Sequence, residues 1–364
     1  MPASARRSRT RSGRRCGMVT RHDVTGAGGL RLAAWEYGTS AGPGAATPTG
    51  AGAPARTGAD RSAQADARAA AGVAAAADKA VPDGGGEPRL VAPRPSEEAP
   101  GGQPPGVLLL HGELGLASHW AATARHLAPR YRAVALDQRG HGHSGRPAGP
   151  CTPEAYVQDA LATVEHLGLG PVTVVGHSMG ALTAWRCAVR RPDLVAAVVL
   201  CDMRASAVGE AAQREWAEWL ASWPLPFATL DDARQWFGVD DPRADPPDPV
   251  RGDFFAEVMS EREDGWRPAY EAAHLLRSRE HWIRDAHWDE LAQVRCPALV
   301  VRGPAGELGR AEAQEMVRVL PRGSYAEIAD AGHLAPWERP EVWAEVLDRF
   351  VGEAVAAREA AGSA

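Results

Sequence analysis

One serine in this 364-residue chain stands in a setting that favours nucleophilic chemistry. Ser178 is the centre of G-H-S-M-G, with a β-branched apolar run before it and apolar residues at helical spacing after it. In a sharp strand-to-helix turn, glycines two positions before and after the serine remove Cβ atoms that would collide. The N-terminal amides of the helix then face any negative charge that develops there. Ser178 is therefore predicted to be a nucleophile.

A second match to this motif, G-T-S-A-G at residues 38–42, lacks that setting. It follows a mixed stretch and runs into Ala, Gly and Pro residues that cannot continue as an amphipathic helix. Because the motif is weak by itself, its surroundings decide between the two matches, and they favour Ser178.

A serine hydroxyl needs a base that accepts its proton. Among the twelve histidines, His333 stands in D-A-G-H-L, in a short loop just beyond the last predicted strand. Loops at the carboxyl ends of parallel strands meet at one edge of a sheet, where Ser178 is also expected. His333 is therefore the predicted base. Four other histidines are expected to pack or to support turns: His111, His141, His143 and His177.

Two carboxylates are candidates for the group that orients this base. Glu307 follows an apolar run in V-V-R-G-P-A-G-E-L-G, and Asp202 ends the preceding run in V-L-C-D-M. Both positions fit the edge of the sheet between Ser178 and His333. Glu307 is the preferred acid, and Asp202 is the alternative.

The oxyanion of such a reaction needs backbone N–H donors. Met179, directly after the nucleophile, is predicted to supply one donor. The loop H-G-E-L-G is predicted to supply the other, from Glu113 or Leu114. A carboxylate directed at an oxyanion would raise the barrier, so the Glu113 side chain is expected to turn away or to meet a cation.

The elements that must position these residues alternate between strands and helices. Runs that are apolar throughout predict a mostly parallel, doubly wound α/β sheet covered on both faces. Residues 30–37 alternate more and predict an antiparallel edge hairpin with the residues after Met18. Thr152 followed by Pro153 predicts the start of a helix. The predicted core strands are 107–110, 133–136, 172–175, 196–201, 298–302 and 325–328.

Residues 203–291 break this alternation and hold seven of the twelve tryptophans. The segment has no convincing core strand and is predicted to be a helical cap inserted in the core. Such a cap excludes water and supplies an apolar pocket, although each tryptophan could instead serve only to pack the cap. The predicted pocket residues are His111, Trp216, Trp219 and Trp223.

Composition predicts the remaining boundaries. Residues 1–17 are arginine-rich and have no apolar segment, which predicts a disordered basic tail or a true start at Met18. Residues 38–104 have no aromatic residue and few large aliphatics, which predicts a disordered insertion. The core is then expected to comprise residues 18–37 and 105–352, and residues 353–364 are expected to form a C-terminal tail.

Bulk properties argue against several classes of function. The formal charge of −6 disfavours general nucleic-acid binding, and no apolar run approaches the ~20 residues of a membrane-spanning helix. Five widely separated cysteines have no metal-ligand spacing and suit a reducing cytoplasm. No cofactor or metal is expected, and the oligomeric state stays open.

Four motifs in this order resemble the α/β-hydrolase superfamily: H-G-E at 111–113, D-Q-R-G-H-G-H-S at 137–144, G-H-S-M-G at 176–180 and D-A-G-H at 330–333. The resemblance covers about residues 18–37 and 106–351, and implies a structural role for the D-Q-R-G loop. Glu307 departs from it, because many members have Asp there, and so does the long insertion after Tyr37. Members with an Asp nucleophile, the epoxide hydrolases and haloalkane dehalogenases, are disfavoured because residue 178 is Ser.

The residues and the resemblance together predict a capped, esterase- or lactonase-like serine hydrolase that acts on a small apolar ester through an acyl-enzyme. The same residues could serve amide hydrolysis, carbon–carbon bond hydrolysis or cofactor-free haloperoxidation. A catalytically silent small-molecule binder is the alternative from another class.

Overall fold

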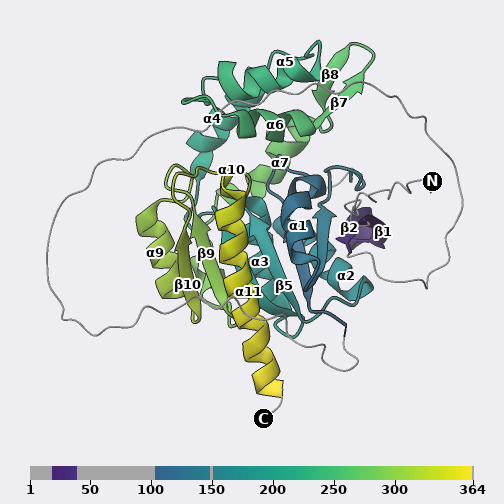
Figure 1. Ribbon diagram of the computed structural model, residues 1–364. Coiled ribbons are helices and arrows are strands. Elements are labelled where there is room, and N and C mark those ends of the chain that lie inside the picture. Colours follow the sequence, from purple (N-terminus) through teal and green to yellow (C-terminus); the bar gives the residue numbers. More distant parts are fainter. Residues whose placement is uncertain (1–18, 39–102, 148–150, 363–364) are drawn as a thin grey trace, which may run out of the picture. The chain divides into compact units, whose positions relative to one another are not determined.

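The computed structural model describes residues 19–38, 103–147 and 151–362. The predicted basic tail and nearly all of the predicted insertion lie outside these residues. One eight-stranded sheet has the order β1-β2-β4-β3-β5-β6-β9-β10 (Figure 1). Its strands are β1 (Val19–Thr25), β2 (Arg31–Tyr37), β3 (Gly106–Leu110), β4 (Arg132–Asp137), β5 (Val172–His177), β6 (Val195–Cys201), β9 (Ala298–Arg302) and β10 (Gly323–Glu327).

The sheet is parallel from β4 to β10 and antiparallel at the β1 edge. The neighbouring pairs among β4, β3, β5, β6, β9 and β10 are all parallel. β2 pairs antiparallel with β4, and β1 pairs antiparallel with β2. The predicted mostly parallel sheet and the predicted edge hairpin are therefore confirmed.

Helices cover both faces of this sheet. One face packs on α2 (Pro153–His166) and α3 (Met179–Arg190), which contact side chains such as Leu108 and Val174. The other packs on α1 (Ala121–Leu127) and α11 (Pro340–Gly362), which contact Val107 and Leu109 (Figure 1). Burial of successive residues on opposite faces explains why these strands are apolar throughout. Four further elements complete this core: η1 (Ala27–Gly29), η2 (Ala117–Trp120), α9 (Arg310–Val319) and α10 (Ala335–Glu338).

Two helix ends test the sequence predictions directly. α2 begins as predicted, because the Thr152 side chain accepts a hydrogen bond from the Ala155 N–H at 3.3 Å and Pro153 is the first helical residue. The predicted limit of the core at residue 352 is wrong. α11 continues to Gly362, and Ala354 and Val355 still pack against the core.

Most of the segment 203–291 forms the cap, a layer over the carboxyl ends of the strands (Figure 1). It is mainly helical, as expected, but it also contains a small antiparallel hairpin that the sequence analysis missed. Its aromatic interior includes Trp219, Phe254 and Phe255, and it extends to Leu114 and Leu334 of the core. The elements of the segment are α4 (Gly209–Ala221), α5 (Leu230–Gln235), η3 (Trp236–Asp240), α6 (Pro249–Glu257), β7 (Met259–Arg262), β8 (Gly265–Pro268), α7 (Ala272–Ile283) and α8 (Trp288–Leu291). The last of them, α8, packs against α3 and α9 of the core, so the predicted cap boundary at residue 291 lies too far along the chain.

None of the helices in the described part of the chain is both long and apolar enough to cross a membrane.

Candidate active site

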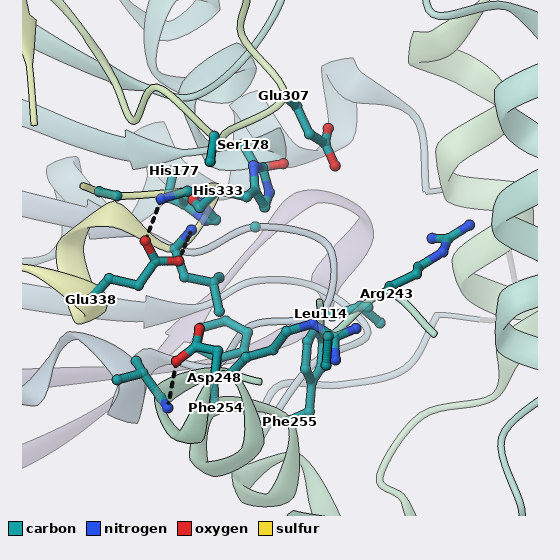
Figure 2. A pocket seen from close by; sticks show the side chains of 18 of the residues that line it. Leu114, His177, Ser178, Arg243, Asp248, Phe254, Phe255, Glu307, His333 and Glu338 are labelled. Carbon is teal, nitrogen blue, oxygen red and sulfur yellow. Dashed lines mark hydrogen bonds between the residues drawn. The ribbon is translucent and has the colours of Figure 1, made fainter. Parts of the chain in front are cut away.

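A cavity of about 910 Å³ lies between the carboxyl ends of the strands and the cap (Figure 2). Its core wall contains Gly112 to Gly115, Ser178, Glu307 and His333. The cap contributes four aromatic side chains, three arginines, two aspartates and several small apolar residues, namely Trp216, Trp219, Phe254, Phe255, Arg243, Arg251, Arg279, Asp245, Asp248, Ala244, Pro246, Pro247 and Val250. Three of the four sequence motifs, at 111–113, 176–180 and 330–333, therefore converge on one water-accessible space roofed by the cap.

Ser178 occupies a strained turn between β5 and α3. Its φ and ψ are 52° and −124°, a conformation that residues with a Cβ rarely adopt, and its N–H donates to the Cys201 carbonyl at 2.8 Å. The flanking glycines allow close backbone contact. A Cβ at Gly176 would collide with the Gly180 backbone, and one at Gly180 would collide with the Leu110 carbonyl. The turn thus depends on the glycine spacing of the motif.

Replacing Gly180 by alanine should lower the free energy of unfolding by at least about 2 kcal/mol, because neither β3 nor α3 can move away without losing core contacts. Equilibrium denaturation in urea measures this loss. Gly309→Ala is the matched control, since a Cβ there meets nothing within 4 Å and the φ of −63° suits alanine. The free energy of unfolding of Gly309→Ala should differ from that of the wild type by less than about 1 kcal/mol. Equal losses in the two variants would contradict the packing argument.

His333 pairs with Asp202, not with Glu307. Its Nδ1 donates to Asp202 Oδ2 at 2.6 Å, and the Asp202 side chain is fully buried. Asp202 directly follows β6, the neighbour of β5, and has a positive φ of 47°. The pairing places an imidazole and a carboxylate at the same edge of the sheet as Ser178, and Figure 2 shows His333 and Ser178 at one wall of the cavity.

The predicted contact of Glu307 with His333 Nδ1 is wrong, and the loop after β9 shows why. This loop wraps around the Asp202 carboxylate, which accepts hydrogen bonds from the backbone N–H groups of Glu307 at 2.8 Å and of Leu308 at 3.2 Å. A Cβ at Gly306 would touch the same carboxylate. The Glu307 backbone therefore holds the acid in place, while its own side chain is exposed and lines the cavity.

The charges around His333 favour its protonated form. Burial alone would lower the pKa of His333, but the carboxylates of Glu307 and Asp202 outweigh burial and raise this pKa to about 9. Glu307 thus acts on the histidine through its field across the cavity, without a hydrogen bond to the ring.

Two further side chains hold the His333 loop, and the sequence analysis did not assign either of them this role. His177, directly before Ser178, donates from Nε2 to the His333 carbonyl at 2.7 Å. Glu338, in α10, accepts hydrogen bonds from the N–H groups of Gly332 and Leu334. A carboxylate five residues after the predicted base was the only available signal for Glu338, and such spacing alone is not diagnostic.

The loop after β3 approaches Ser178 closely. A Cβ at Gly112 would lie 3.1 Å from the Ser178 Cβ, a tight contact that glycine avoids. The Glu113 carbonyl turns away and accepts a hydrogen bond from His141 Nε2 at 2.5 Å. Glu113 and Leu114 both line the cavity, whereas Met179 is the first residue of α3, where an N–H has no partner within the helix.

The Glu113 side chain is buried against the cap. Its Oε2 accepts a hydrogen bond from Trp282 Nε1 at 3.3 Å. Burial raises the pKa of Glu113 to about 7, although the Arg279 charge and the Trp282 hydrogen bond oppose this shift. The carboxyl group therefore lies near a cation of the cap, one of the two arrangements that the sequence analysis expected.

Two of the predicted pocket residues do not line the cavity. His111 is fully buried, donates from Nδ1 to the Gly112 carbonyl at 2.7 Å and accepts from the Gln138 N–H at 3.0 Å. Trp223 lies inside the cap, with its ring 4.8 Å from that of Phe237. Trp216 and Trp219 do line the cavity. Trp216 and Trp219 belong to α4, whereas Trp223 lies just beyond the end of this helix at Ala221 and turns into the cap interior.

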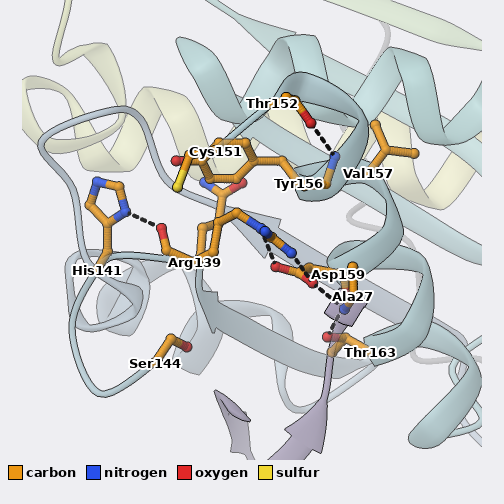
Figure 3. Close-up of polar contacts among 12 residues, drawn as sticks. Ala27, Arg139, His141, Ser144, Cys151, Thr152, Tyr156, Val157, Asp159 and Thr163 are labelled. Carbon is orange, nitrogen blue, oxygen red and sulfur yellow. Dashed lines mark hydrogen bonds and ion pairs between the residues drawn. The ribbon is translucent and has the colours of Figure 1, made fainter. Parts of the chain in front are cut away.

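The D-Q-R-G loop is structural. Arg139 donates twice to the buried Asp159, at 2.7 and 2.8 Å, and Asp159 also accepts from the Ala27 N–H (Figure 3). Ser144 bridges the Asp137 carbonyl and the Ala33 N–H. These contacts tie the edge hairpin and α2 to the core, away from the cavity. Among the described residues, no cluster of three or more His, Cys, Asp or Glu side chains is arranged to hold a metal ion.

A mostly parallel sheet, a serine on a strained strand-to-helix turn and a roofing cap together define the α/β-hydrolase fold. The model of the alpha/beta hydrolase family matches residues 107–346, and the chain belongs to this family.

Two curated relatives and one solved structure are similar to it. Lipase LipV of Mycobacterium tuberculosis is 30% identical over 256 residues, which cover 68% of this chain and 94% of the lipase. (E)-2-((N-methylformamido)methylene)succinate hydrolase of Acinetobacter baylyi is 27% identical over 244 residues, 65% of this chain and 86% of that protein. A crystal structure of E-2-(acetamidomethylene)succinate hydrolase has a TM-score of 0.65 at 19% identity and covers 92% of this chain and 100% of that one, which supports the fold.

Proposed function

We propose that the protein is a serine hydrolase that cleaves a carboxylic ester or lactone through an acyl-enzyme, with Ser178 as nucleophile, His333 as base and Asp202 as the orienting acid. The observation that carries the proposal is the 2.6 Å hydrogen bond from His333 Nδ1 to buried Asp202, at the cavity wall that also contains Ser178. This bond fixes the tautomer in which Nε2 can accept a proton.

In the proposed reaction, His333 Nε2 takes the hydroxyl proton as Ser178 Oγ attacks the carbonyl carbon. The C–O bond to the leaving alcohol then breaks, and His333 returns the proton to that oxygen. Water activated by the same nitrogen attacks the acyl-enzyme and releases the acid. The Met179 N–H, at the start of α3, and the N–H of Glu113 or Leu114 are the proposed donors to the oxyanion. The cap limits access of bulk water to this site.

The test is covalent labelling with a fluorophosphonate, followed by mass spectrometry of the digested protein. The expected result is one adduct on the peptide that contains Ser178 and no adduct in Ser178→Ala. Labelling that persists in the variant would exclude Ser178 as the sole nucleophile. A protein that binds no label would favour the silent binder.

Amide hydrolysis is the second candidate. The name of the Acinetobacter relative describes the hydrolysis of a formamido-substituted succinate, and the match to that protein covers 65% of this chain. The same proposed triad could attack an amide carbonyl, with His333 protonating the leaving nitrogen. Labelling of Ser178 without turnover of a panel of esters would favour this candidate.

The reaction should have an acid limb at unusually high pH. His333 acts as a base only when neutral, so kcat/KM should rise with pH through its raised pKa of about 9. Glu307→Gln removes the negative charge that contributes most to this increase, so its acid limb should move to lower pH. At pH 7 the variant should then be more active than the wild type. Steady-state pH profiles of both proteins measure this, and a loss of activity at pH 7 in the variant would contradict the electrostatic role.

A further inference from the structure

The cavity contains a buried cation that the proposed mechanism does not use. Arg279, on α7 of the cap, is only 8% exposed and lines the cavity. No hydrogen bond or ion pair joins its guanidinium to another residue in the described ranges, and its Nε is buried without a partner. Two indoles flank it, because its Cζ lies 4.9 Å from the ring centroid of Trp216 and 4.8 Å from that of Trp282.

The other arginines that the cap contributes to the cavity differ from Arg279. Arg251 forms an ion pair with buried Asp241. Arg243 is exposed and donates to the Glu215 carbonyl at 3.0 Å. A buried guanidinium with unsatisfied donors is costly, and aromatic faces compensate only part of that cost. Of the three cap arginines, Arg279 should therefore contribute most to the binding of an anion that enters the cavity.

Three charged groups face Arg279, and none of them neutralises it as a fixed partner. They are Glu113 from the loop after β3, Glu307 from the loop after β9 and Arg243 from the cap. Glu113 makes no ion pair within 4 Å of Arg279, and burial raises the pKa of Glu113 to about 7. Glu113 Oε1 is also buried without a partner. Below that pH Glu113 is mostly neutral and can itself donate a hydrogen bond to an anion.

Arg279 connects to the reaction centre through a short series of contacts. Gly112 packs against Ser178, and the next residue, Glu113, accepts a hydrogen bond from Trp282. Trp282 stacks with Arg279 one turn earlier on α7. A substrate bound at Ser178 therefore has Arg279 on the cap side of the same cavity.

We propose that Arg279 binds a carboxylate carried by the substrate, at a position separated from the scissile carbonyl by a short apolar spacer. The aromatic side chains of the cap would contact the spacer. This inference rests on the proposed function and narrows its substrate class to anionic esters or lactones. Bidentate hydrogen bonding between a planar guanidinium and a carboxylate supplies the recognition.

The test compares monomethyl glutarate with dimethyl glutarate, which differ by the charge of one group. Initial rates of methanol release give kcat/KM for each ester. The wild type should prefer the anionic ester by at least about tenfold, and Arg279→Gln should lower this ratio by at least about tenfold. The ratio does not depend on the fraction of folded enzyme, so a partly unfolded variant still gives a valid result.

Arg243→Gln is the matched control, because it removes one positive charge from the same cavity at an exposed position. It should change the ratio by less than about threefold, since an exposed charge is screened. Equal losses of preference in Arg279→Gln and Arg243→Gln would overturn the assignment to Arg279. A wild-type protein that hydrolyses the two esters equally well, or prefers the neutral one, would overturn the proposal itself.

A binding measurement separates this inference from the proposed function. Calorimetry should detect glutarate binding to Ser178→Ala, which cannot form an acyl-enzyme. Adding Arg279→Gln to that protein should raise the Kd by at least about tenfold. If neither ester is hydrolysed, the proposed function fails while the calorimetric result still decides the carboxylate site. Undetectable binding to Ser178→Ala, or an unchanged Kd in the double variant, would overturn the site.

Discussion

Asp202→Asn should lower kcat by about 10⁴-fold, the loss found in serine proteases when the equivalent aspartate becomes asparagine. The Asp202 carboxylate accepts the Nδ1–H of His333 at 2.6 Å, so Nε2 is left to act as base. An amide at this position can present its NH₂ group to Nδ1 and so favour the wrong tautomer. Asparagine also tolerates the positive φ of 47°, so the backbone should be preserved. Steady-state kinetics on an ester substrate at the pH optimum measures the loss.

Glu307→Gln is the matched control for this experiment. It makes the same change from carboxylate to amide in the loop that wraps Asp202, and the backbone N–H that binds Asp202 stays in place. Its plateau activity at high pH should stay within about tenfold of the wild type, because it removes a nearby charge but no hydrogen bond to His333. A larger loss in Glu307→Gln than in Asp202→Asn would restore Glu307 as the orienting acid.

Ser178→Ala should lower kcat by about 10⁶-fold, as removal of a serine nucleophile does in subtilisin. Without Oγ no acyl-enzyme forms, and only binding and oxyanion stabilisation remain. The strained φ of 52° makes a folding check necessary, for which thermal melting beside the wild type suffices. Ser118→Ala, at an exposed serine outside the cavity wall, is the matched control and should keep full activity.

Combining Ser178→Ala with His333→Ala tests whether the two residues act as one unit. The double variant should be about as inactive as Ser178→Ala alone, because a base without its nucleophile contributes little. Additive losses would mean that the residues act in independent steps, and would contradict the proposed mechanism.

The fold and two members of the candidate site could be predicted from local signals. Buried parallel strands are apolar throughout, which located β3, β4, β5, β6 and β9, whereas β10 is partly exposed and begins two residues before its predicted start at residue 325. The glycines around Ser178 are required by contacts within a few residues of the turn and with Leu110, so the motif carries its own structural reason. His333 could be placed because it lies in the loop that follows the last strand, which ends at Glu327, and such loops converge at the carboxyl ends of the strands.

The acid could not be predicted, because it depends on which strands are neighbours. Asp202 and Glu307 both follow strands that end at the correct edge. β6 lies directly beside β5, whereas β9 is one strand further away, and the loop after β9 folds back over Asp202. The path of this loop, with Gly306 against the Asp202 carboxylate and backbone N–H groups bound to it, therefore determines which carboxylate contacts His333. The pattern of side chains in the sequence carries no information about that path.

The sequence alone determined the sheet, the glycine-flanked turn at Ser178 and the place of His333 at the same edge, because strand burial and glycine sterics are local requirements visible in residue type and spacing. Only the tertiary structure decided which carboxylate meets His333, which tryptophans reach the cavity and that Arg279 lies buried in it without a partner. Most of these features depend on contacts between segments far apart in the sequence, such as Trp282 with Glu113, which are 169 residues apart. The physical reason is that the burial and charge pairing of a side chain depend on how all the segments pack together, whereas the conformation of a turn depends mainly on its own few residues.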